Sequence, residues 1–320
     1  MDAVDLELFE QSLAHATREH SGPPLDAALE ELGWPDALAN ESSAAIATLF
    51  PLQGAANSTS SALGQVVLHS LGLHPPPATE VVLPAIGRWD PPGTLSRGGL
   101  QVDGLAAGAL RGPEFAVVAA GDERGPIALT VPSASLTVAC VGGVDPNYGL
   151  SRVTGEEIRT YTELEPSPAD WASAVAFARL ALAHELVGAS RKMLELAREH
   201  ALHRMQFGRP ISSFQAIRHR LADTLVAIEM AEALLDAAWL DVTPNSAAMA
   251  KAVAGRQARV AGRHCQQVLA GIGFTTEHPL HLFVRRALVL DGLFGTATSV
   301  TKVLGEEMLR VATLPPLLPL

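Results

Sequence analysis

Apolar residues recur with two different periods along the chain. Beyond Pro166 they follow the three-and-four spacing of amphipathic helices as far as about Arg310. Residues 1–76 show the same spacing in shorter pieces, one marked by Val4, Leu6, Phe9 and Leu13 and another running from Leu63 to Leu71. Between these regions the pattern changes to short β-rich runs bounded by Gly, Pro and Asp, which are "EVVLPAI", "LQVDGL", "EFAVVAAG" and "IALTVPSASLTVACV". The chain is therefore predicted to be helical, then β, then helical again.

This order predicts a mainly α fold with a small β-domain, divided into three domains. Residues 1–76 are expected to form an N-terminal helical domain, which ends at Pro75-Pro76-Pro77 because no helix continues through three prolines. Residues 77–166 are expected to form the small β-domain and residues 167–320 a C-terminal helical bundle. In the bundle the spacing predicts helices over 170–203, 212–240 and 245–269, with shorter ones near 280–291 and 296–311. The tail "LPPLLPL" is expected to be an extended arm or disordered.

The composition indicates a packed globular protein and narrows the partners it can have. Of 320 residues, 48% are hydrophobic and only 18% charged, which argues against disorder. The net charge of −11 argues against nucleic acid, because no basic stripe is present to neutralise phosphates. Local arginines in an acidic protein can still bind a phosphorylated small molecule.

Cysteine content and hydropathy point to the cytoplasm. Cys140 and Cys265 are the only cysteines and lie far apart, which gives neither a disulfide framework nor a zinc pattern. No apolar run reaches the roughly 18–20 residues that a membrane span needs. The amino terminus, "MDAVDLELFEQ", lacks the basic start and apolar core of a signal peptide. We therefore expect a soluble cytoplasmic protein that does not contact a membrane.

The connector between the first two bundle helices contains more charged, amide and aromatic side chains than a helix–helix turn needs. A plain connector is a few polar residues with a glycine. The segment "RMQFGRPISSFQ", residues 204–215, instead contains two arginines, two glutamines, two phenylalanines and a Gly-Arg-Pro sequence. Taken singly, these residues are ordinary core or solvated side chains, so any functional reading depends on their order.

Two stretches carry a resemblance to a known family. Residues 203–223, "HRMQFGRPISSFQAIRHRLAD", resemble the signature that joins two long helices in acyl-CoA dehydrogenases. Residues 266–296, "QQVLAGIGFTTEHPLHLFVRRALVLDGLFGT", resemble the segment that ends at the catalytic carboxylate of that family. Together with Ala183–Gly188 they cover most of residues 167–310. The family fold implies an N-terminal helical domain, a middle β-barrel-like domain and a C-terminal four-helix bundle.

The resemblance also implies a cofactor and the residues that contact it. The family binds FAD at a subunit interface, and Arg204 matches the arginine that meets the FAD pyrophosphate of the neighbouring subunit. A guanidinium suits this role because it presents paired donors to phosphate oxygens. The family's other dinucleotide contacts match Gln206 and Phe207 beside it, Gln215 on the next helix, and Gln267 with Gly271 at the adenosine end.

The chain departs from the family where the chemistry occurs. The family's general base is a glutamate just before a Gly-Thr pair, and here that position is Phe294, ahead of Gly295-Thr296. The alternative position on the preceding long helix is Ala178. Neither side chain can accept a proton, and losing a general base lowers the rate by roughly 10²–10⁴-fold. In addition, "LPAIGRWDPPG" does not match the family's flavin-binding loop, and both front domains are short.

These departures resemble the small subunit of the heterotetrameric α2β2 acyl-CoA dehydrogenases of actinobacteria, which act on steroid side-chain CoA thioesters. That resemblance implies a larger partner subunit with the catalytic base, an acyl-CoA substrate and electron transfer to an electron-transfer flavoprotein. Two alternatives stay open: a flavin-free scaffold, and a homomeric dehydrogenase that uses Asp291 as its base. No metal site is predicted, because Glu277, His278 and His281 are too few for one.

Overall fold

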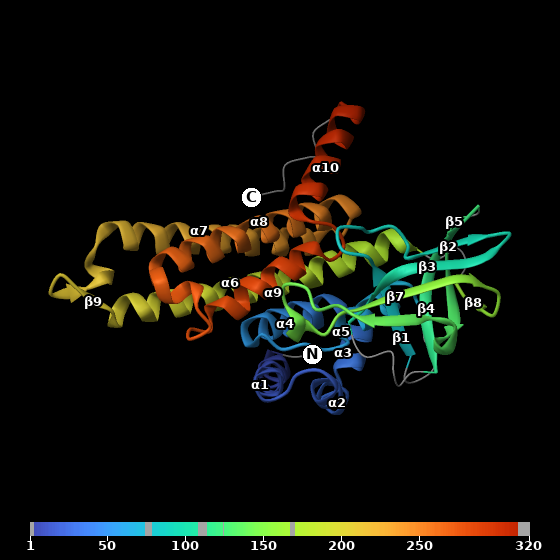
Figure 1. The fold of residues 1–320 in the computed structure, drawn as a ribbon, viewed down its shortest axis with the longest axis horizontal. Coiled ribbons are helices and arrows are strands. Elements are labelled where there is room, and N and C mark those ends of the chain that lie inside the picture. The colour runs from blue at the N-terminus through green and yellow to red at the C-terminus, as the bar shows by residue number, and fades with distance from the viewer. Residues whose placement is uncertain (1–2, 74–78, 108–113, 124, 167–169, 313–320) are drawn as a thin grey trace.

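The computed structural model describes residues 3–73, 79–107, 114–123, 125–166 and 170–312 (Figure 1). The predicted fold class, mainly helical with a small β region, is confirmed. The Pro75–Pro77 run and the tail at 314–320 lie outside the described residues, so the predicted domain boundaries remain our interpretation. The first part of the chain is a group of helices: α1 (Ala3–Glu19), α2 (Pro23–Glu31), α3 (Trp34–Asn40), α4 (Ser42–Ala56) and α5 (Ala62–Ser70).

The strands that follow form one sheet in the order β6-β7-β3-β1-β4-β5-β8, with β2 pairing both β3 and β4. Neighbours are antiparallel except for β1 with β4 and β2 with β4, which are parallel. Short 3₁₀ turns lie at Ser133–Ser135 and Pro146–Tyr148. The strands are β1 (Thr79–Pro84), β2 (Gly93–Ser96), β3 (Gly99–Ala106), β4 (Phe115–Asp122), β5 (Gly125–Pro132), β6 (Thr137–Cys140), β7 (Ser151–Ile158) and β8 (Thr162–Leu164).

The last part of the chain is a bundle of long helices with the sheet at one end and a small hairpin at the other (Figure 1). The spacing of apolar residues predicted these helices to within three residues at each end. The largest difference is the start of the second helix, expected at 212 and found at Gln215, because Ile211–Ser213 form a 3₁₀ turn and Phe214 is extended. The helices are α6 (Trp171–His203), α7 (Gln215–Leu240), α8 (Pro244–Leu269), α9 (Leu280–Gly292) and α10 (Ala297–Val311).

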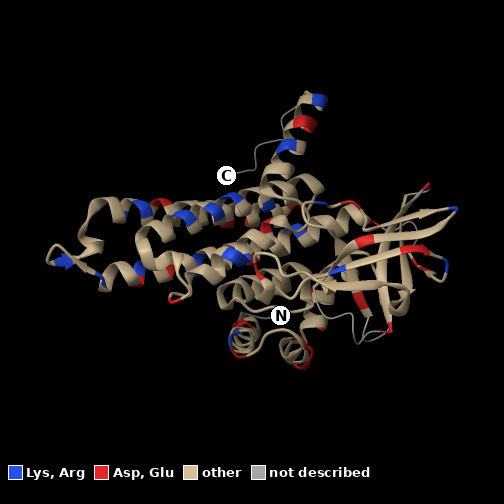
Figure 2. Ribbon diagram, in the orientation of Figure 1, with Lys and Arg blue, Asp and Glu red and all other residues tan. Residues whose placement is uncertain are grey.

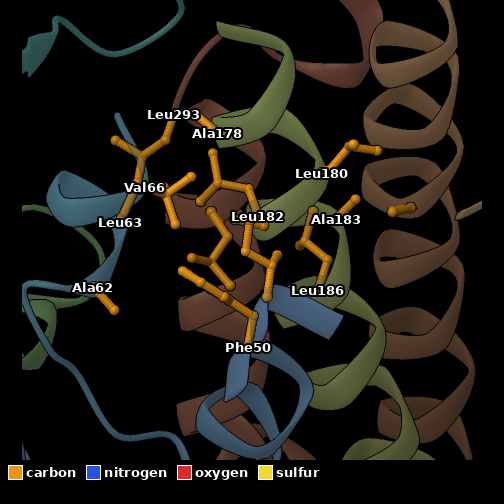
Figure 3. Packing of buried hydrophobic residues seen from close by; sticks show 14 of the residues in the cluster. Phe50, Ala62, Leu63, Val66, Ala178, Leu180, Leu182, Ala183, Leu186 and Leu293 are labelled. Carbon is orange, nitrogen blue, oxygen red and sulfur yellow. The ribbon is translucent and has the colours of Figure 1, made fainter. Parts of the chain in front are cut away.

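Helix α6 is the core of the molecule, and small residues allow α4 to cross it in backbone contact. A Cβ added at Gly188 would lie 2.0 Å from the Pro51 carbonyl oxygen. One added at Gly54 would lie 2.1 Å from the Glu185 carbonyl oxygen. Larger side chains at either glycine would therefore separate the two helices. Leu182, Leu186 and Phe50 pack beside this crossing (Figure 3).

A fully buried arginine on α9 joins all three parts of the chain. The Arg286 guanidinium donates through Nη1 to the Ser58 carbonyl at 2.7 Å and through Nη2 to the Asn57 carbonyl at 3.2 Å. Its Nε lies 3.0 Å from Asp145 Oδ2, in the loop after β6. Its Nη1 also lies 3.4 Å from Glu185 Oε1 on α6. The side chain is completely inaccessible to solvent, so these contacts must replace its hydration.

The carboxylates around Arg286 share a single buried cation. Burial raises the pKa of Glu185 to about 7, although the Arg286 charge opposes that shift. The Tyr148 ring lies under the guanidinium, 4.8 Å from centroid to Cζ, and burial raises the pKa of its hydroxyl. Arg286 therefore pairs most closely with Asp145, at 3.0 Å, and lies 3.4 Å from Glu185, with backbone carbonyls and a ring face completing its surroundings.

Two helical spans, Trp171–His203 and Leu280–Val311, are long and apolar enough to cross a membrane. In the first, 83% of the apolar window is buried inside the protein, as expected for the central helix of a core. The second is 50% buried and is broken by the turn between α9 and α10. Hydropathy of this kind is weak support for a membrane span, and the predicted cytoplasmic location stays a prediction.

We expect Arg286→Met to lower the free energy of unfolding by about 3–5 kcal/mol, because it leaves Asp145 buried without its cation. The matched control is Arg285→Met, one residue away on the exposed side of α9, which should change stability by less than about 0.5 kcal/mol. Urea titration followed by circular dichroism measures both. Equal effects of the two substitutions would contradict the assigned role of Arg286.

Candidate functional site

The unusual connector folds as a β-hairpin at the tip of the bundle. Strand β9 (Met205–Gln206) pairs antiparallel with β10 (Arg209–Pro210), and Arg209 lies opposite Gln206. The two turn residues, Phe207 and Gly208, have φ of 53° and 76°. Two positive φ angles are what a tight two-residue hairpin requires, and glycine adopts them easily whereas phenylalanine does not.

Phe207 is exposed as well as conformationally unusual. Its side chain is 90% accessible, and its only ring contact in the described structure is an edge-on approach to Phe214 at 6.1 Å between centroids. Arg209 lies over the other ring, with its Cζ 4.4 Å from the Phe214 centroid. Packing within this chain therefore explains Phe214 but not Phe207. An aromatic side chain held out in solvent on a rigid turn is typical of a contact to another molecule.

The six residues predicted to contact a dinucleotide are all exposed. Arg204 directly follows α6, Gln206 lies in β9 and Phe207 lies in the hairpin turn. Gln215 is the first residue of α7. Gln267 lies in the last turn of α8, and Gly271 lies in the following 3₁₀ segment, Ala270–Phe274. The ends of α6 and α8 lie at the same end of the bundle, where the His200 and His278 rings approach to 6.3 Å (Figure 1). The structure thus brings the two matched stretches to one edge.

The residue that the sequence resemblance matches to the family's base position is enclosed in the protein. Phe294 lies in the turn between α9 and α10, is completely buried, and has a φ of 52°. Its ring lies 6.4 Å from the Trp171 ring at the start of α6. Gly295 follows with a φ of 95°, and a Cβ there would lie 2.7 Å from the Trp89 ring. Aromatic side chains therefore fill the space around this turn.

Two buried basic side chains donate to the carbonyl groups of the same turn. Arg179 Nε, from α6, donates to the Phe294 carbonyl at 3.1 Å. Lys251 Nζ, from α8, donates to the carbonyls of Asp291 and Gly295 at 3.0 and 3.3 Å. Burial lowers the pKa of Lys251 to about 7 and that of Arg179 to about 10. These contacts satisfy carbonyls that helix termini otherwise leave unpaired.

Asp291 is engaged in the architecture of the turn. Its Oδ1 accepts from the Ala297 backbone N–H at 2.9 Å, at the first residue of α10. Its Oδ2 lies 3.1 Å from Arg259 on α8, and the side chain is almost fully buried. A Cβ on Gly255 would lie 2.1 Å from Asp291 Oδ1, so a glycine is needed there. The carboxylate therefore anchors α10 and is paired with a cation.

The loop between β1 and β2 covers the turn from the sheet side. The Gly87 N–H donates to the Gly292 carbonyl at 2.8 Å. The Trp171 indole Nε1–H donates to the Trp89 carbonyl at 2.8 Å, and Arg179 Cζ lies 5.2 Å from the Trp89 ring centroid. This loop lies within the stretch "LPAIGRWDPPG", in which the sequence predicted no flavin-binding loop. The indole ring of Trp89 lies beside Gly295.

Sequence reasoning missed the residues that close this turn. Lys251 and Arg179 left a signal, because each is a lone cation on an otherwise apolar helical face. Lys251 falls on the buried stripe of Ala247, Ala250, Ala254 and Ala258, and Arg179 falls within "AVAFARLALA". Trp89 left no such signal in the sequence, because the residues that it contacts are about 80 and 200 residues away in the chain. Among the described residues, no group of three or more His, Cys, Asp and Glu side chains is placed to hold a metal ion.

Comparison with known proteins shows what the carboxy-terminal part of the chain is similar to. Residues 171–309 match the family described as acyl-CoA dehydrogenase, C-terminal domain. This part of the chain is therefore similar to the C-terminal domain of acyl-CoA dehydrogenases. The chain is 36% identical over 168 residues to acyl-CoA dehydrogenase IpdE2 of Mycobacterium tuberculosis, covering 52% of this chain and 51% of that relative. It is 29% identical over 300 residues to IpdE2 of Mycolicibacterium smegmatis, covering 88% and 91%.

Two solved structures share the fold over nearly the whole chain. The Tcur3481-Tcur3483 steroid acyl-CoA dehydrogenase variant has a TM-score of 0.81 at 19% identity, covering 97% of this chain and 99% of that one. The ChsE4-ChsE5 complex of Mycobacterium tuberculosis has a TM-score of 0.79 at 18% identity, covering 99% of each chain. At such identities the likeness concerns the fold alone. The region that aligns with the M. tuberculosis relative covers about half of that relative's length.

We expect Lys251→Met to destabilise the protein by about 1–3 kcal/mol for each carbonyl left without a donor. The loss relative to wild type should grow from pH 7 to pH 10. In that range native Lys251, with its pKa near 7, binds fewer protons than the unfolded lysine near 10.5, so raising the pH stabilises the wild type. Urea titrations at several pH values measure this, with the exposed Lys302→Met as control. A deficit that does not change with pH would mean that the buried amine stays charged.

Proposed function

We propose that this chain is the subunit of a heteromeric FAD-dependent acyl-CoA dehydrogenase that completes the cofactor site of a larger partner. The partner carries the catalytic base and introduces the α,β double bond into an acyl-CoA thioester. The observation that carries the proposal is the enclosed turn at Phe294. A side chain without a proton acceptor occupies the base position, and it is buried between Trp171 and the loop that contains Trp89.

The enclosed turn leaves this chain poorly suited to hold a substrate of its own. A general base must lie within hydrogen-bonding reach of the proton that it abstracts. Asp291 is paired with Arg259 and accepts from the Ala297 N–H, and it lies three residues before Phe294. These contacts argue against a homomeric dehydrogenase that uses Asp291 as its base.

The exposed edge, in contrast, has the chemistry to hold a dinucleotide. Arg204 is exposed and forms no ion pair with a described carboxylate, so its guanidinium is available to a pyrophosphate. Gln206, Gln215 and Gln267 present amide groups to solvent, and a Cβ on Gly271 would meet no atom within 4 Å. This donor set fits FAD bound mainly by another chain. FAD supplies the hydride acceptor when bound, and the residues of this chain hold and orient its dinucleotide portion.

Retention of this edge argues against a flavin-free scaffold. A scaffold needs neither an exposed arginine at the hairpin nor a phenylalanine held at positive φ and 90% exposed. Both are what a protein uses to bind an anion and an aromatic or sugar surface.

The relatives support a proposal for the substrate class and the assembly. Tcur3481-Tcur3483 is a steroid acyl-CoA dehydrogenase named for two proteins, and ChsE4-ChsE5 is a complex. We infer an α2β2 assembly with a bulky, steroid-type acyl-CoA as substrate. An electron-transfer flavoprotein is the inferred electron acceptor.

Arg204→Ala should weaken FAD retention in the heteromer without unfolding either subunit, because one charge-assisted contact, worth roughly 1.5–3 kcal/mol, is lost. Arg204→Lys should restore part of the effect, since the charge remains but the planar fork does not. Flavin absorbance after serial dilution and filtration measures retention, and Arg198→Ala on the exposed face of α6 is the control. Flavin content equal to wild type would remove Arg204 from the cofactor site.

Asp291→Asn should leave the turnover of the heteromer within about threefold of wild type, because the amide oxygen can still accept from the Ala297 N–H and no proton transfer is lost. Removing the partner's catalytic carboxylate should abolish turnover. The assay uses a steroid-type acyl-CoA and an artificial electron acceptor. A hundredfold loss in Asp291→Asn, with normal assembly and flavin content, would show that this chain supplies its own base.

A further inference from the structure

A long groove lies on the opposite side of the bundle from α1, between α8, α9 and α10. Its volume is about 700 Å³, and residues from all three helices line it. Helix α8 contributes Arg256, Arg259 and Arg263, and α10 contributes Thr298 and Lys302. The floor is apolar and includes Leu288 of α9, whose side chain is 48% exposed. The groove therefore combines a basic wall, a wall that carries a hydroxyl and an amine, and an apolar floor.

The basic wall is largely unneutralised within the chain. Arg256 and Arg263 lie on one face of α8, seven residues and so about 10 Å apart, and neither forms an ion pair with a carboxylate in the described ranges. Arg259 between them is paired with Asp291, and Lys302 only approaches the exposed Glu306, at 3.7 Å. Figure 2 shows basic residues gathered along the bundle on the α7 and α8 side. In a protein with a net charge of −11, such a concentration of cations indicates a specific anionic counterpart.

The wall formed by α10 continues past the groove into solvent. Val300 and Leu304 pack this helix onto Ala248 and Ala252 of α8, but its outer turns project from the body (Figure 1). Helical spacing places Gly305 and Leu309 in line with Thr298 and Lys302. A Cβ on Gly305 would meet no atom within 4 Å, and Leu309 is 84% exposed. An apolar residue this exposed, at the end of a projecting helix, leaves the surface incomplete without another chain.

We propose that this groove is the docking surface for an acidic amphipathic helix of the larger partner subunit. The inference rests on the proposed function, since that subunit is the partner. The helix places Asp or Glu side chains against Arg256 and Arg263 and an apolar stripe on Leu288 and Leu309. Helix-in-groove binding of this kind uses anchors at three-, four- and seven-residue spacing.

Size and charge favour this occupant over two others. A small anion would neutralise the arginines but would leave Leu309 uncovered, because that residue lies beyond the groove. A second copy of this chain, pairing through the same face, would set Arg256 and Arg263 against their own equivalents. Like charges brought together in an interface weaken it by several kcal/mol. An unlike, acidic partner satisfies both the charge and the exposed apolar residues.

The test is the dissociation constant of the heteromer, measured by dilution and mass photometry of this full chain with the co-purified larger subunit. We expect the double variant Arg256→Glu with Arg263→Glu to weaken association at least about a hundredfold. The matched control is Arg18→Glu with Arg97→Glu, which makes the same charge change on exposed arginines of α1 and the β2–β3 turn. It should bind as wild type. Leu309→Asp is a second variant, exposed and therefore safe for folding, that should weaken association about tenfold.

The outcomes separate this inference from the proposed function. If the wild-type heteromer forms with bound FAD and both groove variants assemble normally, the docking surface is wrong and the proposed function stands. If the wild type forms no heteromer, both are wrong. If the groove variants instead abolish a homodimer of this chain, the occupant is a second copy and the proposal is overturned. Arg204→Ala provides the internal contrast, because it should lower FAD content while leaving assembly intact.

Discussion

The buried guanidinium of Arg286 is the contact on which the rest of the structure depends. It bonds to the carbonyls of Asn57 and Ser58 after α4, to Asp145 after β6 and to Glu185 on α6. A charge this deep is tolerated only where its donors are satisfied. Helix α9 is therefore fixed against the N-terminal helices, the sheet and the core helix at once. The turn that follows α9 takes its position from that constraint.

The same turn has a different chemistry from a site that abstracts a proton. A catalytic carboxylate there needs room for a substrate and a lining that tunes its pKa. In this chain aromatic rings fill the space, and the buried basic side chains of Arg179 and Lys251 donate to backbone carbonyls. Both basic side chains are committed to architecture, and the residues matched to dinucleotide contacts lie at the hairpin edge. A filled turn together with an exposed hairpin edge suits a subunit that contributes residues to a neighbour's site.

Sequence periodicity was enough for the helices because their apolar faces repeat over many turns. The family resemblance, carried by the order of Arg204, Gln206, Phe207 and Gln215, pointed to residues that the structure shows to be exposed. Periodicity could not locate the contacts that enclose Phe294, because Trp89 reaches the turn from a loop about 200 residues away. Nor could periodicity tell which of Arg285 and Arg286 is buried. The two are adjacent in sequence, yet one is exposed and the other is fully buried.

The central claim is that this chain offers an edge to a partner's FAD and has no complete flavin site of its own. The most direct test is the flavin absorbance of the purified chain, alone and after co-expression with the larger acyl-CoA dehydrogenase subunits of its source genome. The account predicts a colourless protein alone, even after incubation with excess FAD and gel filtration, and a yellow complex with one such subunit. A stoichiometric flavin spectrum from the chain by itself would contradict it.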